Sequence, residues 1–190
     1  MKIVALGDSL TAGYNIAANM AFPAQLERAL KAKGHAVEVV NAGVSGDTAS
    51  GGLARLDWSV PQDTDAVILE LGANDALRGI DPAVTRKALD AILKRLTGRK
   101  IPVLLAGMRA PPNLGADYAR AFDGIYPALA KEYGTLLYPF FLTDVAAVRS
   151  LNLPDGLHPT AEGVAVIVRG LLPMAEQLVT LAMQNRAARS

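Results

Sequence analysis

The 190-residue chain contains no cysteine. Disulfides, thiolate nucleophiles and cysteine-ligated metal sites are therefore excluded together. Histidine is almost as scarce, since His35 and His158 are the only two. Because the other possible metal ligands are carboxylates, we expect no metal site.

A surplus of charge of either sign is also missing. Lysine and arginine together number 19 and aspartate and glutamate 18, which leaves a net charge of +1. Nucleic-acid-binding proteins usually carry a basic patch or stripe, and this chain has no run of basic residues. We therefore expect no nucleic-acid partner.

Long uninterrupted hydrophobic runs are the third absence. The most apolar region, 164–183, contains Arg169, Pro173 and Glu176, so we expect a surface helix there and no membrane span. The opening residues, MKIVALGDSL, have one lysine and a short apolar run without a cleavage site, which is typical of a first strand rather than a signal peptide. The chain is expected to be either cytoplasmic or a mature form that has lost a leader.

The composition is that of a globular protein, with 51% hydrophobic and 19% charged residues. A chain of this length can bury a sizeable core as one unit. No internal repeat, low-complexity tract or linker divides it. We therefore predict a single domain over residues 1–190, whose oligomeric state the sequence does not indicate.

Five short runs rich in Val, Ile and Leu alternate with helical patterns. Strands are predicted at Lys2–Leu6, Val37–Asn41, Ala66–Leu71, Pro102–Ala106 and Thr135–Tyr138. Runs such as AVILEL and PVLLAG are continuously apolar, which is typical of parallel strands covered by helices on both faces. The alternation predicts an α/β fold with three layers, a parallel sheet between two layers of helices.

Capping residues and glycines indicate where the helices begin and end. A helix is predicted over residues 22–34, and a second begins at Asp81-Pro82 and runs to Gly98. Further helices are predicted at Asp117–Tyr133 and Thr160–Met183, with a shorter one after Thr48.

Functional residues of such sheets gather in the loops that leave the carboxyl ends of the strands. The first four of these loops, GDSLTAGY, NAGVSGDTASGG, GANDALRG and GMRAPPNLGAD, are rich in Gly, Ser, Asn and Asp. The loops that lead into the strands, such as KAKGHA and LTGRKI, are plain and basic. We therefore expect the site at the carboxyl edge, and His35 at the opposite edge as a surface residue.

Three residues of these loops have the chemistry of a catalytic triad. Ser9 follows the first strand and would become a nucleophile if a neighbouring base took its proton. His158 is the histidine expected on the correct side, and Asp155 precedes it by three residues in the loop PDGLHPT. Pro154 and Pro159 limit the freedom of this loop, so one turn could hold both groups.

Acyl transfer also requires hydrogen-bond donors aimed at the developing oxyanion. The candidates lie on three different loops: the backbone N–H of Ser9, the backbone N–H of Gly46 and the side-chain amide of Asn74. Glycine at position 46 lets the backbone approach a substrate closely, and Asn74 offers an N–H₂ group without adding charge.

The blocks GDSLTAGY, NAGVSGDT, GANDALRG and DGLHP, in this order, resemble those of the SGNH (GDSL-type) hydrolase family over nearly the whole chain. This resemblance implies a flavodoxin-like, five-stranded sheet of order 2-1-3-4-5. It also implies that Ser9 is the nucleophile, that Gly46 and Asn74 complete the oxyanion hole, and that Asp155 and His158 complete the triad.

Within that family the stretches SGDTASGGLARL, NDALRG and AFDGIYPALAKEYG are similar to the bacterial multifunctional acyl-CoA thioesterase, lysophospholipase and arylesterase group. The resemblance implies hydrolysis of aryl or short-to-medium acyl esters, acyl-CoA thioesters or lysophospholipids without a cofactor. It also implies a periplasmic location. The alternatives are a carbohydrate O-acetylesterase on the same scaffold and a non-catalytic protein that binds acyl groups or lipids.

Single residues of these loops also have simpler interpretations. A lone serine after a strand is more often a helix cap, and a lone Asp/His turn is more often structural. Ser45 is a rival nucleophile, but GVSGD lacks the G-x-S-x-G spacing of another hydrolase class, so we expect it to support its loop. Asp8 and Asp75 are expected to be supporting hydrogen-bond partners and Asp47 to cap the next helix, with a catalytic role as the alternative for each. The loop 107–120 either lines an acyl pocket or is a surface excursion.

Overall fold

The computed structural model describes residues 1–188, and the strands of this part of the chain form one parallel sheet. They are β1 (Lys2–Gly7), β2 (Glu38–Gly43), β3 (Ala66–Glu70), β4 (Val103–Ala106) and β5 (Leu136–Tyr138). Their order is β2-β1-β3-β4-β5, and each neighbouring pair is parallel. The expected five-stranded sheet and its order are confirmed.

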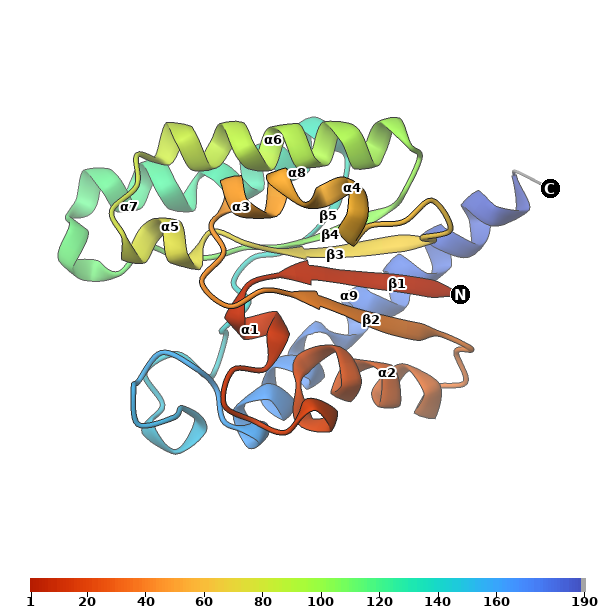
Figure 1. Cartoon of the computed structure of the whole chain (residues 1–190), viewed down its shortest axis with the longest axis horizontal. Coiled ribbons are helices and arrows are strands. Elements are labelled where there is room, and N and C mark those ends of the chain that lie inside the picture. The colour runs from red at the N-terminus through yellow and green to blue at the C-terminus, as the bar shows by residue number, and fades with distance from the viewer. Residues whose placement is uncertain (189–190) are drawn as a thin grey trace.

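Helices cover both faces of the sheet and complete the three layers (Figure 1). They are α1 (Ser9–Ala12), α2 (Phe22–Ala32), α3 (Ala49–Ala54), α4 (Leu56–Ser59), α5 (Ala73–Leu77), α6 (Pro82–Gly98), α7 (Ala116–Asp123), α8 (Ile125–Tyr133) and α9 (Ala161–Ala187). One layer contains α2 and α9, and the other contains α3, α6 and α8 (Figure 1).

The central strands are buried because helices cover them on both sides. Every residue of β3 is buried, as are the last five residues of β1. This burial explains the continuously apolar runs of the sequence, since neither face of these strands meets water. Glu70, the last residue of β3, differs from the apolar residues before it because it carries a fully buried carboxyl group.

The boundaries of α6 follow from its local chemistry. Its N-cap is Asp81, whose side chain accepts a hydrogen bond of 2.8 Å from the N–H of Ala83, and Pro82 occupies the first turn. Proline is tolerated there because the first N–H groups of a helix have no partner within it. The predicted ends of this helix, Asp81-Pro82 and Gly98, are confirmed.

The single helix predicted over Asp117–Tyr133 is wrong, because the structure has two helices that meet at Gly124. Pro127 supplies the reason. It has no N–H to donate to the carbonyl of Asp123, and its ring crowds that carbonyl. The helical pattern of apolar residues continues through this break, which is why periodicity alone joined the two segments.

The last helix begins where predicted, with Thr160 as N-cap, and ends at Ala187 rather than Met183. By length and composition α9 could cross a membrane. Nine of its 27 residues are nevertheless buried within the protein, and it packs against α2 beneath the sheet. Contact with the core therefore accounts for its apolar face.

Candidate active site

Ser9 lies at the carboxyl end of β1, as the first residue of the short helix α1. The preceding Asp8 is the N-cap, and its Oδ1 accepts a hydrogen bond of 2.9 Å from the N–H of Leu10. The chain turns so tightly here that a Cβ added to Gly7 would lie 2.0 Å from Oγ1 of Thr11. Only glycine fits at position 7, and the turn leaves Ser9 at the rim of the sheet.

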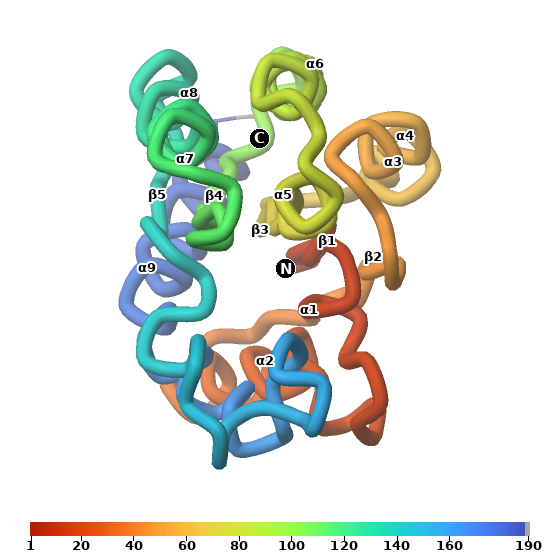
Figure 2. The backbone as a smooth tube through the Cα atoms, turned by 90° about the vertical axis from the view of Figure 1, so that its left-hand side faces the viewer, coloured from red at the N-terminus to blue at the C-terminus, as the bar shows by residue number. Residues whose placement is uncertain are grey.

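The structure brings the three predicted triad residues together. Nε2 of His158 lies 2.9 Å from Oγ of Ser9, although the two residues are 149 positions apart. Nδ1 of the same ring lies 2.7 Å from Oδ2 of Asp155. In Figure 2, which faces the carboxyl ends of the strands, the segment after β5 passes beside α1.

A compact turn holds Asp155 and His158. The N–H of Leu153 donates to the carbonyl of His158 at 2.7 Å, and the N–H of Gly156 donates to the carbonyl of Leu153 at 2.9 Å. Gly156 has φ +71°, a left-handed conformation that glycine adopts without strain. The turn therefore has its own backbone hydrogen bonds, and the histidine ring does not depend on side-chain packing alone.

The carboxylate of Asp155 is strongly stabilised in its ionised form. Hydrogen bonds from the backbone N–H groups of His158 and Leu157, followed by that of the His158 ring, lower the pKa of Asp155 to about 2. An ionised carboxylate can only accept hydrogen bonds, so Nδ1 of His158 carries the proton. In the neutral ring Nε2 is then the unprotonated nitrogen, and it faces the hydroxyl of Ser9.

A tyrosine that the sequence pattern did not point to covers the histidine ring. The ring of Tyr14 lies with its centroid 4.4 Å from that of His158, at an interplanar angle of 35°. Tyr14 belongs to the same block, GDSLTAGY, as Ser9. The segment after β1 thus contributes both the hydroxyl that His158 faces and an aromatic surface beside it.

The three candidate oxyanion donors are linked by Asn74, near the start of α5. Its Nδ2 donates to Oδ2 of Asp8 at 3.1 Å and to the carbonyl of Asp47 at 2.9 Å. Asp8 directly precedes Ser9, and Asp47 directly follows Gly46. The amide therefore lies between the loops that carry the two backbone donors.

Gly46 occupies a tight turn whose geometry requires glycine. The N–H of Asp47 donates to the carbonyl of Val44 at 3.2 Å, and Gly46 between them has φ +85°. This is the position of a β-turn at which a side chain would be strained. Arg78 donates to the carbonyl of Gly46 at 2.8 Å, and that contact fixes the orientation of the following peptide.

Two carboxyl groups are buried beneath the serine. Burial raises the pKa of Asp8, and burial together with the nearby charge of Asp8 raises the pKa of Glu70. Oε2 of Glu70 accepts hydrogen bonds from Oγ1 of Thr11 at 2.8 Å and from the N–H of Asp8 at 3.3 Å. Glu70 was missed at the sequence level because it stands inside the apolar run AVILEL.

Of the three aspartates expected to support the site, Asp8 and Asp75 accept hydrogen bonds as predicted, and the cap predicted for Asp47 is wrong. Asp75 is buried and accepts hydrogen bonds from the N–H of Ala49 at 2.8 Å and from Oγ1 of Thr85 at 2.9 Å. Asp47 does not cap α3, since Oγ1 of Thr48 accepts the hydrogen bond from the helix. Asp47 instead pairs with Arg55 at 2.6 Å.

A cavity of about 390 Å³ opens onto the nucleophile and base candidates and onto the Asn74 amide. Ser9, Asn74 and His158 line one part of it, and the rest is largely apolar. The apolar part includes Leu77, Met108, Pro111, Phe140 and Leu142. Its size is within the range of small-molecule sites. The first part of the loop 107–120 therefore lines the pocket, the first of the two interpretations that the sequence left open.

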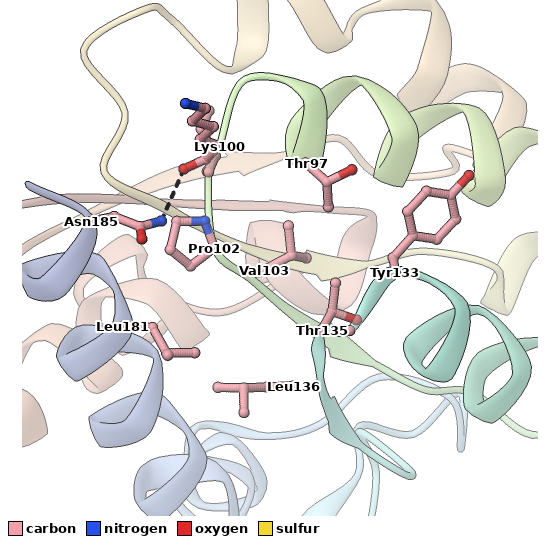
Figure 3. Close-up of a pocket in the computed structure, with 11 residues that line it drawn as sticks. Thr97, Lys100, Pro102, Val103, Tyr133, Thr135, Leu136, Leu181 and Asn185 are labelled. Carbon is pink, nitrogen blue, oxygen red and sulfur yellow. Dashed lines mark hydrogen bonds between the residues drawn. The ribbon is translucent and has the colours of Figure 1, made fainter. Parts of the chain in front are cut away.

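Two other cavities lie at the opposite edge of the sheet. One of about 230 Å³ is bordered by residues that lead into β4 and β5, including Pro102 and Thr135 (Figure 3). His35 borders another and lies 3.4 Å from a carboxylate oxygen of Glu176, half-buried at the amino edge. Among residues 1–188, no cluster of three or more possible His, Cys, Asp or Glu ligands could hold a metal ion.

Comparison with known proteins agrees with this geometry. The model of the GDSL-like Lipase/Acylhydrolase family matches residues 5–166 of the chain. The chain belongs to the SGNH (GDSL-type) hydrolase family. It is 41% identical to an arylesterase of Vibrio mimicus, over 85% of this chain and 81% of that protein. It is 39% identical to thioesterase 1/protease 1/lysophospholipase L1 of Escherichia coli K12, over 93% of this chain and 84% of that protein.

The fold of the SGNH hydrolase is also found among solved structures. The crystal structure of AlinE4, an SGNH-hydrolase family esterase, is 49% identical in sequence and superposes with a TM-score of 0.79. The match covers 93% of this chain and 95% of that one. Family and fold together identify the protein as a serine ester hydrolase.

Proposed function

We propose that this SGNH hydrolase cleaves carboxylic esters and thioesters through an acyl-enzyme on Ser9. The observation that supports this most directly is the unbroken hydrogen-bonded chain from Asp155 through His158 to Ser9, with distances of 2.7 and 2.9 Å. As the hydroxyl oxygen attacks the carbonyl carbon, Nε2 of His158 takes its proton. Asp155 stabilises the imidazolium that forms and keeps its ring oriented.

The developing oxyanion would be bound by the N–H groups of Ser9 and Gly46 and the amide of Asn74. Preorganised donors of this kind are worth roughly 2.7–4 kcal/mol each in the transition state. Because both hydrogens of the Asn74 amide are already engaged, the oxyanion must share or replace one of these contacts. The alcohol or thiol then leaves with the proton from His158, and a water activated by the same ring releases the acid.

The apolar cavity supports an acyl or aryl substituent as the recognised part of the substrate. Its lining by Leu77, Met108 and Phe140 suits a hydrocarbon chain or an aromatic ring rather than a sugar. The names of the relatives, an arylesterase and a thioesterase/lysophospholipase, are compatible with that chemistry. We therefore propose aryl esters, short-to-medium acyl esters, acyl-CoA thioesters and lysophospholipids as the substrate range.

Labelling with a fluorophosphonate tests the nucleophile. The probe should modify the folded protein at Ser9, and the Ser9→Ala variant should be unlabelled and should lose at least ~10⁴-fold of kcat. Ser45→Ala is the matched control and should be labelled normally, since Ser45 is exposed and does not line the cavity. Equal labelling of wild type and Ser9→Ala would contradict the proposal.

A substrate series tests the acyl preference. The rates of hydrolysis of p-nitrophenyl acetate, octanoate and palmitate are compared with the rate of acetate release from acetylated xylan. The comparison distinguishes hydrolysis of acyl or aryl esters from hydrolysis of carbohydrate O-acetyl groups. We expect p-nitrophenyl octanoate to give the highest kcat/KM, and acetylated xylan to be a poor substrate. A burst without steady-state turnover would indicate a binding protein instead.

We also propose that the enzyme acts in the periplasm and that α9 belongs to the core rather than to a membrane. Nine residues of α9 contribute to the buried core, which supports the second part. Reading the codons that precede Met1 and fractionating the producing cells would test the first part. Extraction of the full-length product without detergent would test the second.

A further inference from the structure

Arg55 is a buried cation at the junction of α3 and α4, and its side chain points into the protein. The residue is 6% exposed. Its guanidinium donates four hydrogen bonds: Nε to Oδ2 of Asp47 at 2.6 Å, Nη1 to the carbonyl of Ala42 at 2.9 Å and to Oγ of Ser59 at 3.0 Å, and Nη2 to the carbonyl of Gly7 at 2.8 Å.

Two of these acceptors, Gly7 and Asp47, belong to the segments that carry the oxyanion donors. Gly7 is the last residue of β1 and is separated from Ser9 only by Asp8. Asp47 directly follows Gly46, and its carbonyl accepts the amide of Asn74 at 2.9 Å. A single guanidinium therefore connects the loop of Ser9, the loop of Gly46 and, through Asp47, the contact made by Asn74.

The chemistry at this position requires arginine. A guanidinium presents its donors in a planar, rigid fork, whereas a lysine ammonium is a compact charge on a flexible stem. Burying a cation is unfavourable unless it is paired and hydrogen-bonded. Asp47 supplies the counter-charge, and the side chains of the pair are 8% and 19% exposed. Both partners are therefore held in one geometry.

We infer that Arg55 is a positioning residue of the oxyanion hole. It ties the carbonyl of Gly7 to Asp47 and thereby sets the distance between the backbone N–H groups of Ser9 and Gly46, without touching the substrate. Arg55 does not line the cavity beside Ser9. The inference rests on the proposed function, since it assumes that these donors bind an oxyanion.

The inference predicts an effect on the transition state rather than on substrate binding. Arg55→Lys keeps the charge but cannot reproduce the fork, so the two loops lose their fixed spacing. A displacement of about 1 Å in a catalytic group can cost about 100-fold in rate. We expect kcat to fall by about tenfold to 100-fold with KM within about twofold. Affinity for a trifluoromethyl ketone, which forms a tetrahedral adduct with the serine, should fall in proportion to kcat/KM.

Arg99 provides a matched control, because replacing it tests the effect of losing an arginine that only stabilises the fold. Its guanidinium also donates to backbone carbonyls, those of Val60 at 2.9 Å and Pro61 at 2.8 Å, but these residues lead into β3 at the opposite edge of the sheet. Arg99→Lys should lower the midpoint of urea unfolding as Arg55→Lys does. It should leave kcat and the affinity for the trifluoromethyl ketone unchanged.

The decisive experiment repeats Arg55→Lys in an Asn74→Ala background. If both residues act through the same oxyanion contacts, Arg55→Lys should lower kcat much less in this background than in wild type, because energetic effects of residues acting as a unit are not additive. Fully additive losses, an unchanged kcat in the single variant, or a rise in KM alone would overturn the inference. If Arg55→Lys fails to fold, Asp47→Asn replaces it in the same cycle, because this change removes only the counter-charge of Arg55. The same results would then support or overturn the inference.

Fluorophosphonate labelling of the wild type in the same preparations separates the two claims. If wild type is neither labelled nor active on esters, the proposed function fails. If wild type is labelled and active while Arg55→Lys behaves like Arg99→Lys, only the positioning role of Arg55 fails.

Discussion

The imidazole of His158 contacts groups from two distant parts of the chain. Asp155, three residues earlier, accepts its Nδ1–H, while Ser9 and Tyr14 from the segment after β1 contact the other nitrogen and the ring face. Each contact limits a different motion: the carboxylate selects the tautomer, the hydroxyl sets the direction of Nε2, and the tyrosine ring covers one side. The base therefore faces Ser9 before any substrate binds.

Replacing Asp155 by asparagine should remove the selected tautomer. The amide can donate to Nδ1, which favours a ring with the proton on Nε2, and such a ring cannot accept the proton of Ser9. We expect kcat to fall by ~10⁴-fold with little change in KM, measured on p-nitrophenyl esters. Asp144→Asn, the same change at a residue outside the site, should retain wild-type activity. Less than a tenfold loss in Asp155→Asn would argue against the role assigned to the carboxylate.

Glu70 shows how a buried acid affects stability. Burial, followed by repulsion from Asp8, raises its pKa well above the usual range, so the folded protein keeps a proton that the unfolded chain releases above about pH 4.3. The contribution of Glu70 to the free energy of unfolding must therefore fall as the pH rises from that point towards the pKa of the folded state. The raised pKa of Asp8 acts in the same direction.

Glu70→Gln should weaken this dependence on pH, because glutamine has no proton to release. Urea unfolding at about pH 4.5 and about pH 7.5 should show a smaller loss of stability in the variant than in wild type. Glu38→Gln, at an exposed position, should behave as wild type does. An identical loss in all three proteins would show that Glu70 does not titrate in the way its burial indicates.

At the scale of elements, the ends of strands and helices determine where the functional groups lie. β1, β2 and β3 each end in a glycine-containing turn, and the next few residues carry Ser9, Gly46 and Asn74 respectively. A short helix follows each turn, so the donors and the nucleophile come from backbone that is held at both ends. Rigid elements on either side hold each loop, and the side chains of Arg55 and Asn74 connect one loop to another.

The same local chemistry determines the stability of helices far from the site. Asp81→Ala removes the N-cap of α6 and should lower the free energy of unfolding by about 1 kcal/mol, measured by urea denaturation. Activity should be unchanged, since Asp81 does not line the cavity. Asp57→Ala is a suitable control because its ion pair with Arg95 is highly exposed and should contribute little. Equal losses in both variants would contradict the capping role.

At the scale of the whole molecule, the parallel sheet is what gathers the site. All five strands point the same way, so the loops that leave them meet at one edge, and the long segment after β5 returns to the start of α1 (Figures 1 and 2). The opposite edge contains His35 and the cavity of Figure 3 but none of the candidate catalytic residues.

We expect the molecule to unfold as one cooperative unit, in line with the single domain predicted for residues 1–190. The buried core is shared among the sheet, α2, α6, α8 and α9, so loss of one layer exposes the others. Far-UV circular dichroism and near-UV tyrosine signals should give coincident urea transitions with one midpoint. Two separated transitions would contradict the prediction.

The sequence by itself predicted the five strands, most of the long helices and the candidate site residues. Strand and helix positions follow from apolar periodicity and capping groups, and Ser9, Gly46, Asn74, Asp155 and His158 stand in short motifs whose residue types state their chemistry. These signals extend over only a few neighbouring residues, so a reader of the sequence can recognise them without knowing the fold.

Only the tertiary structure decided which distant groups touch. The contacts of Arg55 with Gly7, of Tyr14 with His158 and the burial of Glu70 depend on the packing of segments tens of residues apart or more. An arginine in a helix or a glutamate in a strand has the same local signature whether it faces water or the protein interior. The physical reason is that burial and long-range contact are properties of the assembled layers, which no local pattern records.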